Sequence, residues 1–221
     1  MPTYAEAQEW NSPDDPVHGW DHVQRVCALA EWLAQQVGAD VEIVRAAALL
    51  HDVAGAAPEA GEAESAGRAA HEQASAEFAR HRLAEEGWSL PRIEAVLHCI
   101  RSHRFRSAEP PATLEARVLF DADKLDVVGA FGAARTIAYA VQAGTPIYAR
   151  PSERFLSSGE VEPGEAHSAY HEYWFKLRKI LERLHTEPAR VLGRERQAVL
   201  TAFFEALAAE AALAEQPPHP G

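Results

Sequence analysis

The chain has 221 residues, of which 47% are hydrophobic and 24% are charged, a composition typical of a globular protein large enough to bury its own core. Its formal net charge of −12 disfavours attraction to nucleic acid or to an anionic membrane surface, so we expect no stable nucleic-acid partner and no membrane partner. No run reaches the length of about 18 uncharged apolar residues that a membrane-spanning helix needs.

The opening stretch and the cysteine content bear on the compartment. The segment "MPTYAEAQEWNSPDDP" carries acidic side chains and no basic ones, unlike a secretory leader. The only two cysteines, Cys27 and Cys99, both lie in segments with helical periodicity, and two cysteines are too few for a disulfide scaffold. We therefore expect a cytoplasmic protein with reduced, buried thiols.

Helical periodicity dominates the first quarter of the chain. Apolar residues recur three and four apart from Val23 to Val37, which predicts a helix with one apolar face. Gly38 is expected to end this helix, and Asp40 to cap the next one over 41–52. The segment 54–70 is rich in glycine, alanine and glutamate, which predicts a mobile loop. Such a loop could be either a lid over a site or a disordered segment.

The remaining periodic segments predict further helices over 70–86, 91–103, 112–143, 165–185 and 188–214, with an irregular stretch at 143–166. The proline-containing segment 215–221 is expected to be a disordered tail. Few segments are predicted to form strands. The pattern predicts an all-α, single-domain protein over 15–214, preceded by an N-terminal extension over 1–14.

Histidine and aspartate side chains interrupt the apolar helical segments at three places. In "HGWDHVQRV", His18, His22 and Arg25 are spaced four and three residues apart, so they share one helical face. His51 and Asp52 directly follow the apolar run "AAALL" at the end of a predicted helix. Buried imidazoles and carboxylates are costly unless they are paired or bound to a metal.

The third place is "RVLFDADKLD", where Asp121, Asp123 and Asp126 follow an apolar run and Lys124 lies among them. Any one of these residues could be a helix cap or an ion-pair partner. Their coincidence on three predicted helices instead favours a shared divalent ion. Imidazole nitrogens and carboxylate oxygens suit Mn, Fe, Co, Ni or Zn.

The order "H…HD…D", with the last aspartate in "DADKL", resembles the HD-domain superfamily of metal-dependent phosphohydrolases. The resemblance extends to "HGWDHVQRV", "SHRF", "DADKLDVVGAFGAART" and the C-terminal stretch from "FKLRKILERL" onward, over roughly residues 18–206. These segments look like a bacterial subgroup similar to nucleotide pyrophosphohydrolases. The resemblance implies a single helical HD-domain bundle with C-terminal helices.

The resemblance also implies a ligand set of His22, His51, Asp52 and Asp123 for one divalent ion, whether Mn, Ni, Co, Fe, Zn or Mg. Asp52 would in addition be a catalytic residue. Such an ion lowers the pKa of bound water and neutralises charge on phosphoryl oxygens. The implied substrate is a small phosphate compound such as a nucleotide, with release of pyrophosphate from nucleoside triphosphates as one form of the reaction.

Several nearby residues are candidates for contact with the substrate. Arg25, one turn from His22, could bind phosphate, and so could Lys124, unless Lys124 is only an ion-pair partner. His103 in "SHRF" matches a histidine position of the subgroup and is expected to contact phosphate or to support a ligand. His18 is a candidate general acid or phosphate donor, with an exposed helix-start histidine as the alternative.

Proton transfer is harder to assign. Asp126 could fix the tautomer of a ligand histidine or pair with Lys124. Many relatives carry an acidic residue soon after the HD pair, whereas this chain reads "HDVAGAAPEAGE". Orientation of the attacking water therefore falls to Asp121 or to a loop glutamate, the candidates being Glu59, Glu62 and Glu64.

His71 and His98 would complete the order "H…HD…H…H…D" of two-metal HD-domain proteins, some of which are di-iron oxygenases. His98 and His103, however, lie five residues apart, about 140° around a helix, so we expect them not to share a face. One metal is therefore preferred over two. A di-iron oxygenase and a non-catalytic nucleotide or metal sensor remain alternative functions, and a homodimer is compatible with the sequence.

Overall fold

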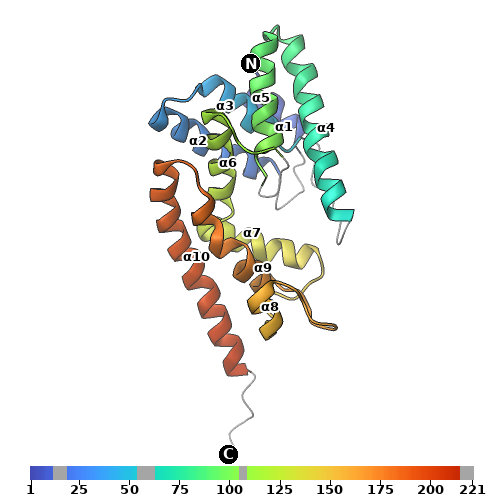
Figure 1. Ribbon diagram of the computed structural model, residues 1–221, viewed down its shortest axis with the longest axis vertical. Coiled ribbons are helices and arrows are strands. Elements are labelled where there is room, and N and C mark those ends of the chain that lie inside the picture. Colours follow the sequence, from blue (N-terminus) through green and yellow to red (C-terminus); the bar gives the residue numbers. More distant parts are fainter. Residues whose placement is uncertain (12–18, 54–62, 105–108, 215–221) are drawn as a thin grey trace, which may run out of the picture. The chain divides into compact units, whose positions relative to one another are not determined.

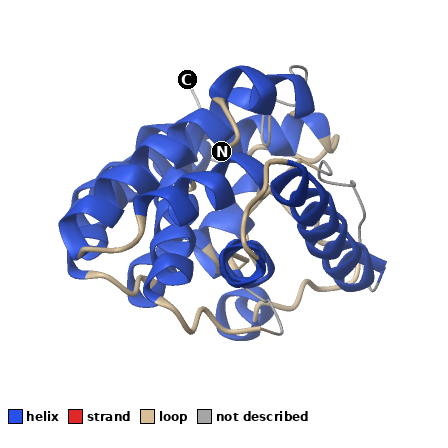
Figure 2. Ribbon diagram, turned by 90° about the horizontal axis from the view of Figure 1, so that it is seen from above, coloured by secondary structure: helices blue, strands red, loops and turns tan. Residues whose placement is uncertain are grey.

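The computed structural model describes residues 1–11, 19–53, 63–104 and 109–214, without the side chains of 63–72 and 214. Within these ranges the regular elements are all helices, and no strand occurs (Figures 1 and 2). The predicted all-α fold is confirmed. None of the helices in the described ranges is both long and apolar enough to cross a membrane.

The chain forms two compact units. The first comprises Met1–Asp126 with Leu184–Arg190, and the second comprises Val127–Arg183 with Val191–Gly221. The division falls at the end of a helix that the sequence pattern had continued to residue 143. The boundaries proposed at residues 14 and 214 stay predictions.

The first unit contains six helices within its described residues: α1 (Tyr4–Trp10), α2 (Trp20–Val37), α3 (Val41–Leu50), α4 (Ala63–Glu85), α5 (Leu90–Ser102) and α6 (Leu114–Asp126). Helix α2 packs against α3 and α6, and α5 packs against α3, α4 and α6. Helices α2, α3, α5 and α6 thus pack together in this unit (Figure 1).

Helix α2 has the predicted apolar face, and its members are fully buried: Val23, Val26, Cys27, Ala30, Leu33 and Ala34. Gly38 ends the helix in the left-handed conformation, with φ of 76°. The Asp40 side chain then caps α3 by accepting hydrogen bonds from the backbone amides of Glu42 and Ile43. Cys27 and Cys99 are buried, free thiols, as predicted.

Two N-terminal segments differ from expectation. The predicted extension contains α1, whose start is fixed by a reciprocal capping box between Thr3 and Glu6. Helix α4 begins at Ala63, so residues 63–70 are helical and not part of a loop; alanine, the commonest residue of this stretch, is a strong helix former. Residues 54–62 lie outside the described part of the chain.

The second unit contains α7 (Gly129–Gln142), α8 (Glu153–Ser158), α9 (Ala169–Phe175), a 3₁₀ helix (Leu177–Arg183) and most of α10 (Glu187–Ala214). Its core includes Tyr173 stacked on Phe204, with ring centroids 4.5 Å apart. The helix predicted over 165–185 is divided into α9 and the 3₁₀ helix. Helix α8 lies within the stretch that was expected to be irregular.

The helix predicted over 112–143 is broken between α6 and α7. Val128 is extended, with φ of −122° and ψ of 166°, and Gly129 has φ of 80°, a conformation that β-branched residues avoid. A Cβ atom at Gly132 would lie 2.3 Å from the carbonyl oxygen of Val127. Glycine at this position therefore allows α7 to start close to the preceding backbone.

Candidate metal centre

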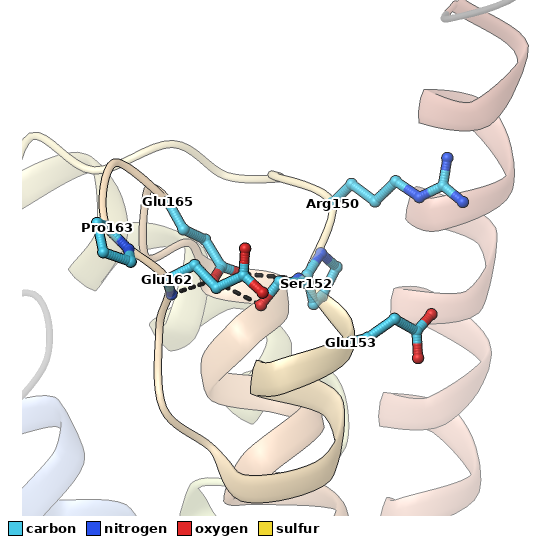
Figure 3. A pocket seen from close by; sticks show the side chains of 7 residues that line it. Arg150, Ser152, Glu153, Glu162, Pro163 and Glu165 are labelled. Carbon is cyan, nitrogen blue, oxygen red and sulfur yellow. Dashed lines mark hydrogen bonds between the residues drawn. The ribbon is translucent and has the colours of Figure 1, made fainter.

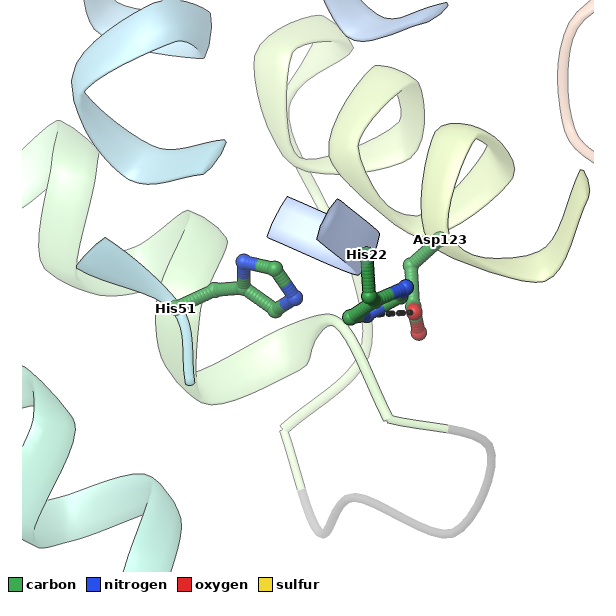
Figure 4. Close-up of side chains that lie close together, drawn as sticks. All are labelled: His22, His51 and Asp123. Carbon is green, nitrogen blue, oxygen red and sulfur yellow. Dashed lines mark ion pairs between the residues drawn. The ribbon is translucent and has the colours of Figure 1, made fainter. Parts of the chain in front are cut away.

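Three helices of the first unit bring the four predicted ligands together. His22 is the third residue of α2, His51 and Asp52 directly follow the last residue of α3, and Asp123 lies near the end of α6. All four are buried. Figure 4 shows His22, His51 and Asp123 approaching one another from these separate elements.

The facing atoms are too far apart for strong hydrogen bonds and close enough to share an ion. His22 Nε2 lies 3.5 Å from Asp123 Oδ1 and 3.8 Å from Asp52 Oδ2. His51 Nε2 lies 3.5 Å from Asp52 Oδ2. Two sets of three residues, His22–His51–Asp123 and His51–Asp52–His103, each place their ligand atoms within 4.8 Å of one another. A transition metal would sit about 2.0–2.2 Å from such atoms.

The hydrogen bonds of the histidines determine where their protons lie. Nδ1 of His51 is 2.7 Å from the carbonyl oxygen of Ala48, and Nδ1 of His103 is 2.6 Å from that of Ile100. A carbonyl oxygen only accepts, so in both rings Nδ1 carries a hydrogen, and in the neutral ring Nε2 then carries a lone pair.

Both lone pairs face Asp52, and this arrangement fits a cation. His51 Nε2 is buried and has no hydrogen-bond partner, and His103 Nε2 lies 3.8 Å from Asp52 Oδ1. In a buried site, a nitrogen lone pair and a carboxylate that face each other repel unless a positive charge lies between them. The donor set of imidazole nitrogen and carboxylate oxygen therefore fits a divalent transition metal.

The protonation states agree with this geometry. Burial, together with the nearby His51, lowers the pKa of His103 to about 3, so its ring is neutral at physiological pH. Burial alone would raise the pKa of Asp123, but Lys124, and next His22, hold this pKa below its usual range. A neutral imidazole and an ionised carboxylate are the forms that bind metals.

Asp126 orients His22, one of the two roles considered for it. Its Oδ2 accepts a hydrogen bond from His22 Nδ1 at 2.7 Å, which directs the Nε2 lone pair toward Asp123 and Asp52. Arg25 holds the same carboxylate with two bonds, from Nε to Oδ1 at 2.8 Å and from Nη2 to Oδ2 at 3.1 Å. The Nη1 of Arg25 also donates to Asp21 Oδ2 at 2.7 Å, and the phosphate contact expected of Arg25 stays a prediction.

Two cations contact the ligand carboxylates. Lys124 Nζ donates to Asp123 Oδ2 at 2.5 Å and lies over the Phe120 ring. Arg104 Nη2 lies 3.4 Å from Asp52 Oδ1. Lys124 was predicted from the sequence as a phosphate contact, whereas Arg104 was not among the predicted site residues. The sequence signal for Arg104 was its position directly after His103 in "SHRF", at the end of α5.

Asp121 is hydrogen-bonded to the segment that precedes α10, and its catalytic role stays a prediction. Its Oδ1 accepts from the backbone amide of His185 at 2.8 Å, and its Oδ2 accepts from the amide and the hydroxyl of Thr186 at 2.8 and 2.7 Å. Burial raises the pKa of Asp121, against the effect of these hydrogen bonds. Asp121 thus fixes the segment before α10 to α6.

Of the two residues predicted for a second metal site, only His98 has a described side chain, and the second site stays a prediction. His98 Nδ1 lies 2.5 Å from Glu109 Oε1, and its Nε2 accepts from the amide of Ala112 at 3.1 Å, so both ring nitrogens are engaged away from the cluster. His71 is on α4, but its side chain is outside the described part, as is that of Glu64. His18, Glu59 and Glu62 also lie outside the described residues.

The second unit has an open pocket of about 550 Å³ that contains none of the predicted site residues (Figure 3). Its central carboxylate, Glu165, accepts hydrogen bonds from the backbone amide of Glu162 and from the amide and hydroxyl of Ser152. The backbone donors lower the pKa of Glu165 to about 2. This carboxylate serves to hold a loop, and we assign no reaction to the pocket.

Comparison with known proteins gives the class to which this site belongs. Residues 19–128 match the HD domain family, and this span contains all four predicted ligands. The chain is a member of the HD-domain superfamily of metal-dependent phosphohydrolases. Members of this family bind a divalent metal ion, in agreement with the donor set described above.

Particular relatives extend the likeness beyond the matched span. The uncharacterised protein YpgQ of Bacillus subtilis is 29% identical over 195 residues, covering 86% of this chain and 82% of YpgQ. A crystal structure from Lactobacillus plantarum is 28% identical with a TM-score of 0.73, covering 96% of this chain and all of that one. An HD-superfamily hydrolase from Bacillus thuringiensis is 26% identical with a TM-score of 0.62, covering 89% and 87%.

Proposed function

We propose that this protein hydrolyses a phosphoester or phosphoanhydride bond in a nucleotide or a related phosphate compound, with one divalent ion held by His22, His51, Asp52 and Asp123. The observation that carries the proposal is the buried His51 Nε2, a lone pair without a hydrogen-bond partner 3.5 Å from the Asp52 carboxylate. A divalent ion is the group that such a buried donor set fits best.

A nucleotide substrate is supported by one relative. YpgQ of Bacillus subtilis was crystallised in complex with ADP, and that structure is 24% identical to this chain with a TM-score of 0.68, covering 94% of this chain and 97% of YpgQ. Identity at this level supports a shared fold, so the nucleotide is a proposal for this chain. Release of pyrophosphate from a nucleoside triphosphate is one form that the reaction could take.

The chain's own residues have distinct tasks in this proposal. When bound, the ion would supply an acidified water and neutralise phosphoryl charge. Asp126 and the carbonyl of Ala48 hold His22 and His51 with Nε2 directed into the site. His103, whose Nε2 is an acceptor, is suited to take a hydrogen bond from the attacking water and not to donate one to phosphate.

One ion is favoured over two because His98 is bonded to Glu109 and Ala112. The alternative function, a di-iron oxygenase, would therefore lack one of its expected ligands in the described part of the chain. Two imidazoles in the ligand set favour Mn, Fe, Co, Ni or Zn, whereas Mg prefers ligands that are all oxygen.

The test is a panel of nucleoside mono-, di- and triphosphates, each incubated with metal-stripped protein and with Mn, Co, Ni, Mg or Zn. We expect release of phosphate or pyrophosphate that needs a metal and is abolished in His51→Ala and Asp52→Asn. His81→Ala removes an exposed histidine on α4 and should leave turnover unchanged. Metal binding with no turnover of any compound would instead support the alternative function, a non-catalytic nucleotide or metal sensor.

A further inference from the structure

The start of α2, which carries the predicted ligand His22, is not capped by a side chain. The cap position is occupied by Gly19, whose carbonyl oxygen accepts hydrogen bonds from the amides of His22 at 3.0 Å and Val23 at 3.3 Å. Glycine is the most flexible residue, and the first turn of a helix frays readily. The position of His22 therefore depends on what packs against this turn.

Tyr4 of α1 contacts the first turns of α2 at two places. Its ring meets the Trp20 ring edge to face, with the centroids 6.0 Å apart and an angle of 81° between the planes. Its hydroxyl group hydrogen-bonds to the thiol of Cys27, two turns further along α2. Trp20 and Cys27 share one face of the helix, and His22 projects about 160° away from Trp20. Tyr4 thus holds the start of α2 from the side opposite His22.

The other end of α1 is fixed to α4. The rings of Trp10 and Phe78 have their centroids 5.3 Å apart, and the guanidinium of Arg82 lies 4.8 Å from the centre of the Trp10 ring. Arg82 Nη2 also lies 3.6 Å from Glu6 Oε1. Helix α1 has only seven residues, so its two ends move together. It connects α2 with α4, although it lies outside the span 19–128 that matches the HD domain.

We propose that α1 is a strap that positions His22. Trp10 anchors the strap to α4, and Tyr4 holds the first turn of α2, so that His22 Nε2 stays directed at the ion position. Tyr4 and Trp10 are positioning residues, because they act through Trp20 and through α4 and not on the ion itself. The inference rests on the proposed function in one respect, namely that His22 binds a metal.

The strap predicts that the two ends of α1 are coupled. Removing the Trp10 ring would release α1 from α4, and Tyr4 would then hold α2 less firmly. Removing Tyr4 abolishes the same contact directly, so the loss of both residues should weaken metal binding no more than the loss of Tyr4 alone. Residues that only stabilise the fold would leave the metal affinity of the folded protein unchanged.

The experiment uses the full chain with Tyr4→Ala, Trp10→Ala and the double variant, together with Tyr4→Phe, which keeps the ring on Trp20. Titration of the metal-free protein with Co²⁺, followed by visible absorption, gives the metal affinity and reports the ligand geometry. Amide hydrogen exchange at Val23 in the metal-free protein reports the opening of the first turn of α2. Tyr173→Ala is the control, because it removes an aromatic contact of the second unit. Thermal unfolding of each variant confirms that it is folded.

We expect Tyr4→Ala and Trp10→Ala each to bind Co²⁺ about 3- to 10-fold more weakly and to exchange the Val23 amide faster. The double variant should match Tyr4→Ala, and Tyr4→Phe and Tyr173→Ala should match the wild type in both measurements. Wild-type Co²⁺ affinity in folded Tyr4→Ala, or losses that add in the double variant, would overturn the strap. Faster exchange in both alanine variants of a chain that hydrolyses no phosphate compound would support the strap and contradict the proposed function alone.

Discussion

The position of one proton on His22 links the metal centre to a chain of charged side chains. Asp126 accepts from His22 Nδ1, and Arg25 holds both oxygens of Asp126. The tautomer that presents Nε2 to the carboxylates therefore depends on two residues that do not contact the ion position. Support of this kind, from outside the ligand set, strongly affects metal affinity.

Asp126→Asn should weaken divalent metal binding by about 10- to 100-fold, because the neutral amide is a weaker acceptor for His22 and loses the ion pair with Arg25. Equilibrium titration with Co²⁺, followed by its visible absorption, measures the affinity. Asp21→Asn is the control, since Asp21 bonds to Arg25 from an exposed position. Equal Co²⁺ affinity in Asp126→Asn and the wild type would show that Asp126 does not position His22.

Asp121 offers the contrasting case of a buried carboxylate that acts on the fold. Asp121→Asn places an amide nitrogen against the N–H donor of either His185 or Thr186, and should lower the free energy of unfolding by about 2–4 kcal/mol. Urea denaturation gives this value, and metal affinity should be unchanged. Loss of turnover without loss of stability would restore the catalytic role.

The sequence was informative about which residues meet and less so about what each one bonds to. The polar residues in apolar segments, together with the resemblance to HD domains, predict that His22, His51–Asp52 and Asp123 form one cluster, and the structure brings these side chains together. Shared helical faces identify only local neighbours, so Arg25 was placed with His22 and a phosphate. Arg25 also binds Asp126, which lies on α6, and no local spacing connects α2 with that helix.

At the scale of elements, the division between α6 and α7 was not visible in the periodicity, because apolar residues continue through "LDVVGAFG" at helical spacing. The break depends on an extended Val128 and a left-handed Gly129, which are backbone states and not side-chain patterns. The capped start of α3 and the apolar face of α2 depend on local residues, and both were predicted.

Gly132→Ala tests this break. The added methyl group would meet the Val127 carbonyl oxygen at 2.3 Å, and backbone atoms cannot move away cheaply, so we expect a loss of at least about 2 kcal/mol in stability. Gly144→Ala is the control, with φ of 67° and no atom within 4 Å of the new Cβ, and should cost about 1 kcal/mol. Equal losses in urea unfolding would contradict the close approach at Gly132.

At the scale of the whole molecule, the ligands come from three helices of the first unit, so an ion bound by all four links these helices in the folded state only. Metal should therefore stabilise the protein, by about 2.7 kcal/mol at a free concentration one hundred times the Kd. Thermal unfolding with Mn²⁺ and with EDTA measures the effect. The shift should disappear in Asp52→Asn and persist in His81→Ala; a shift of equal size in Asp52→Asn would place the ion elsewhere.

The most direct test of the account is ³¹P NMR of the nucleoside phosphate panel incubated with Mn²⁺-loaded wild-type protein and with Asp52→Asn. The account predicts new resonances of inorganic phosphate or pyrophosphate with the wild type, absent in EDTA and absent with Asp52→Asn. The same resonances at equal rates with Asp52→Asn, or with EDTA present, would contradict it.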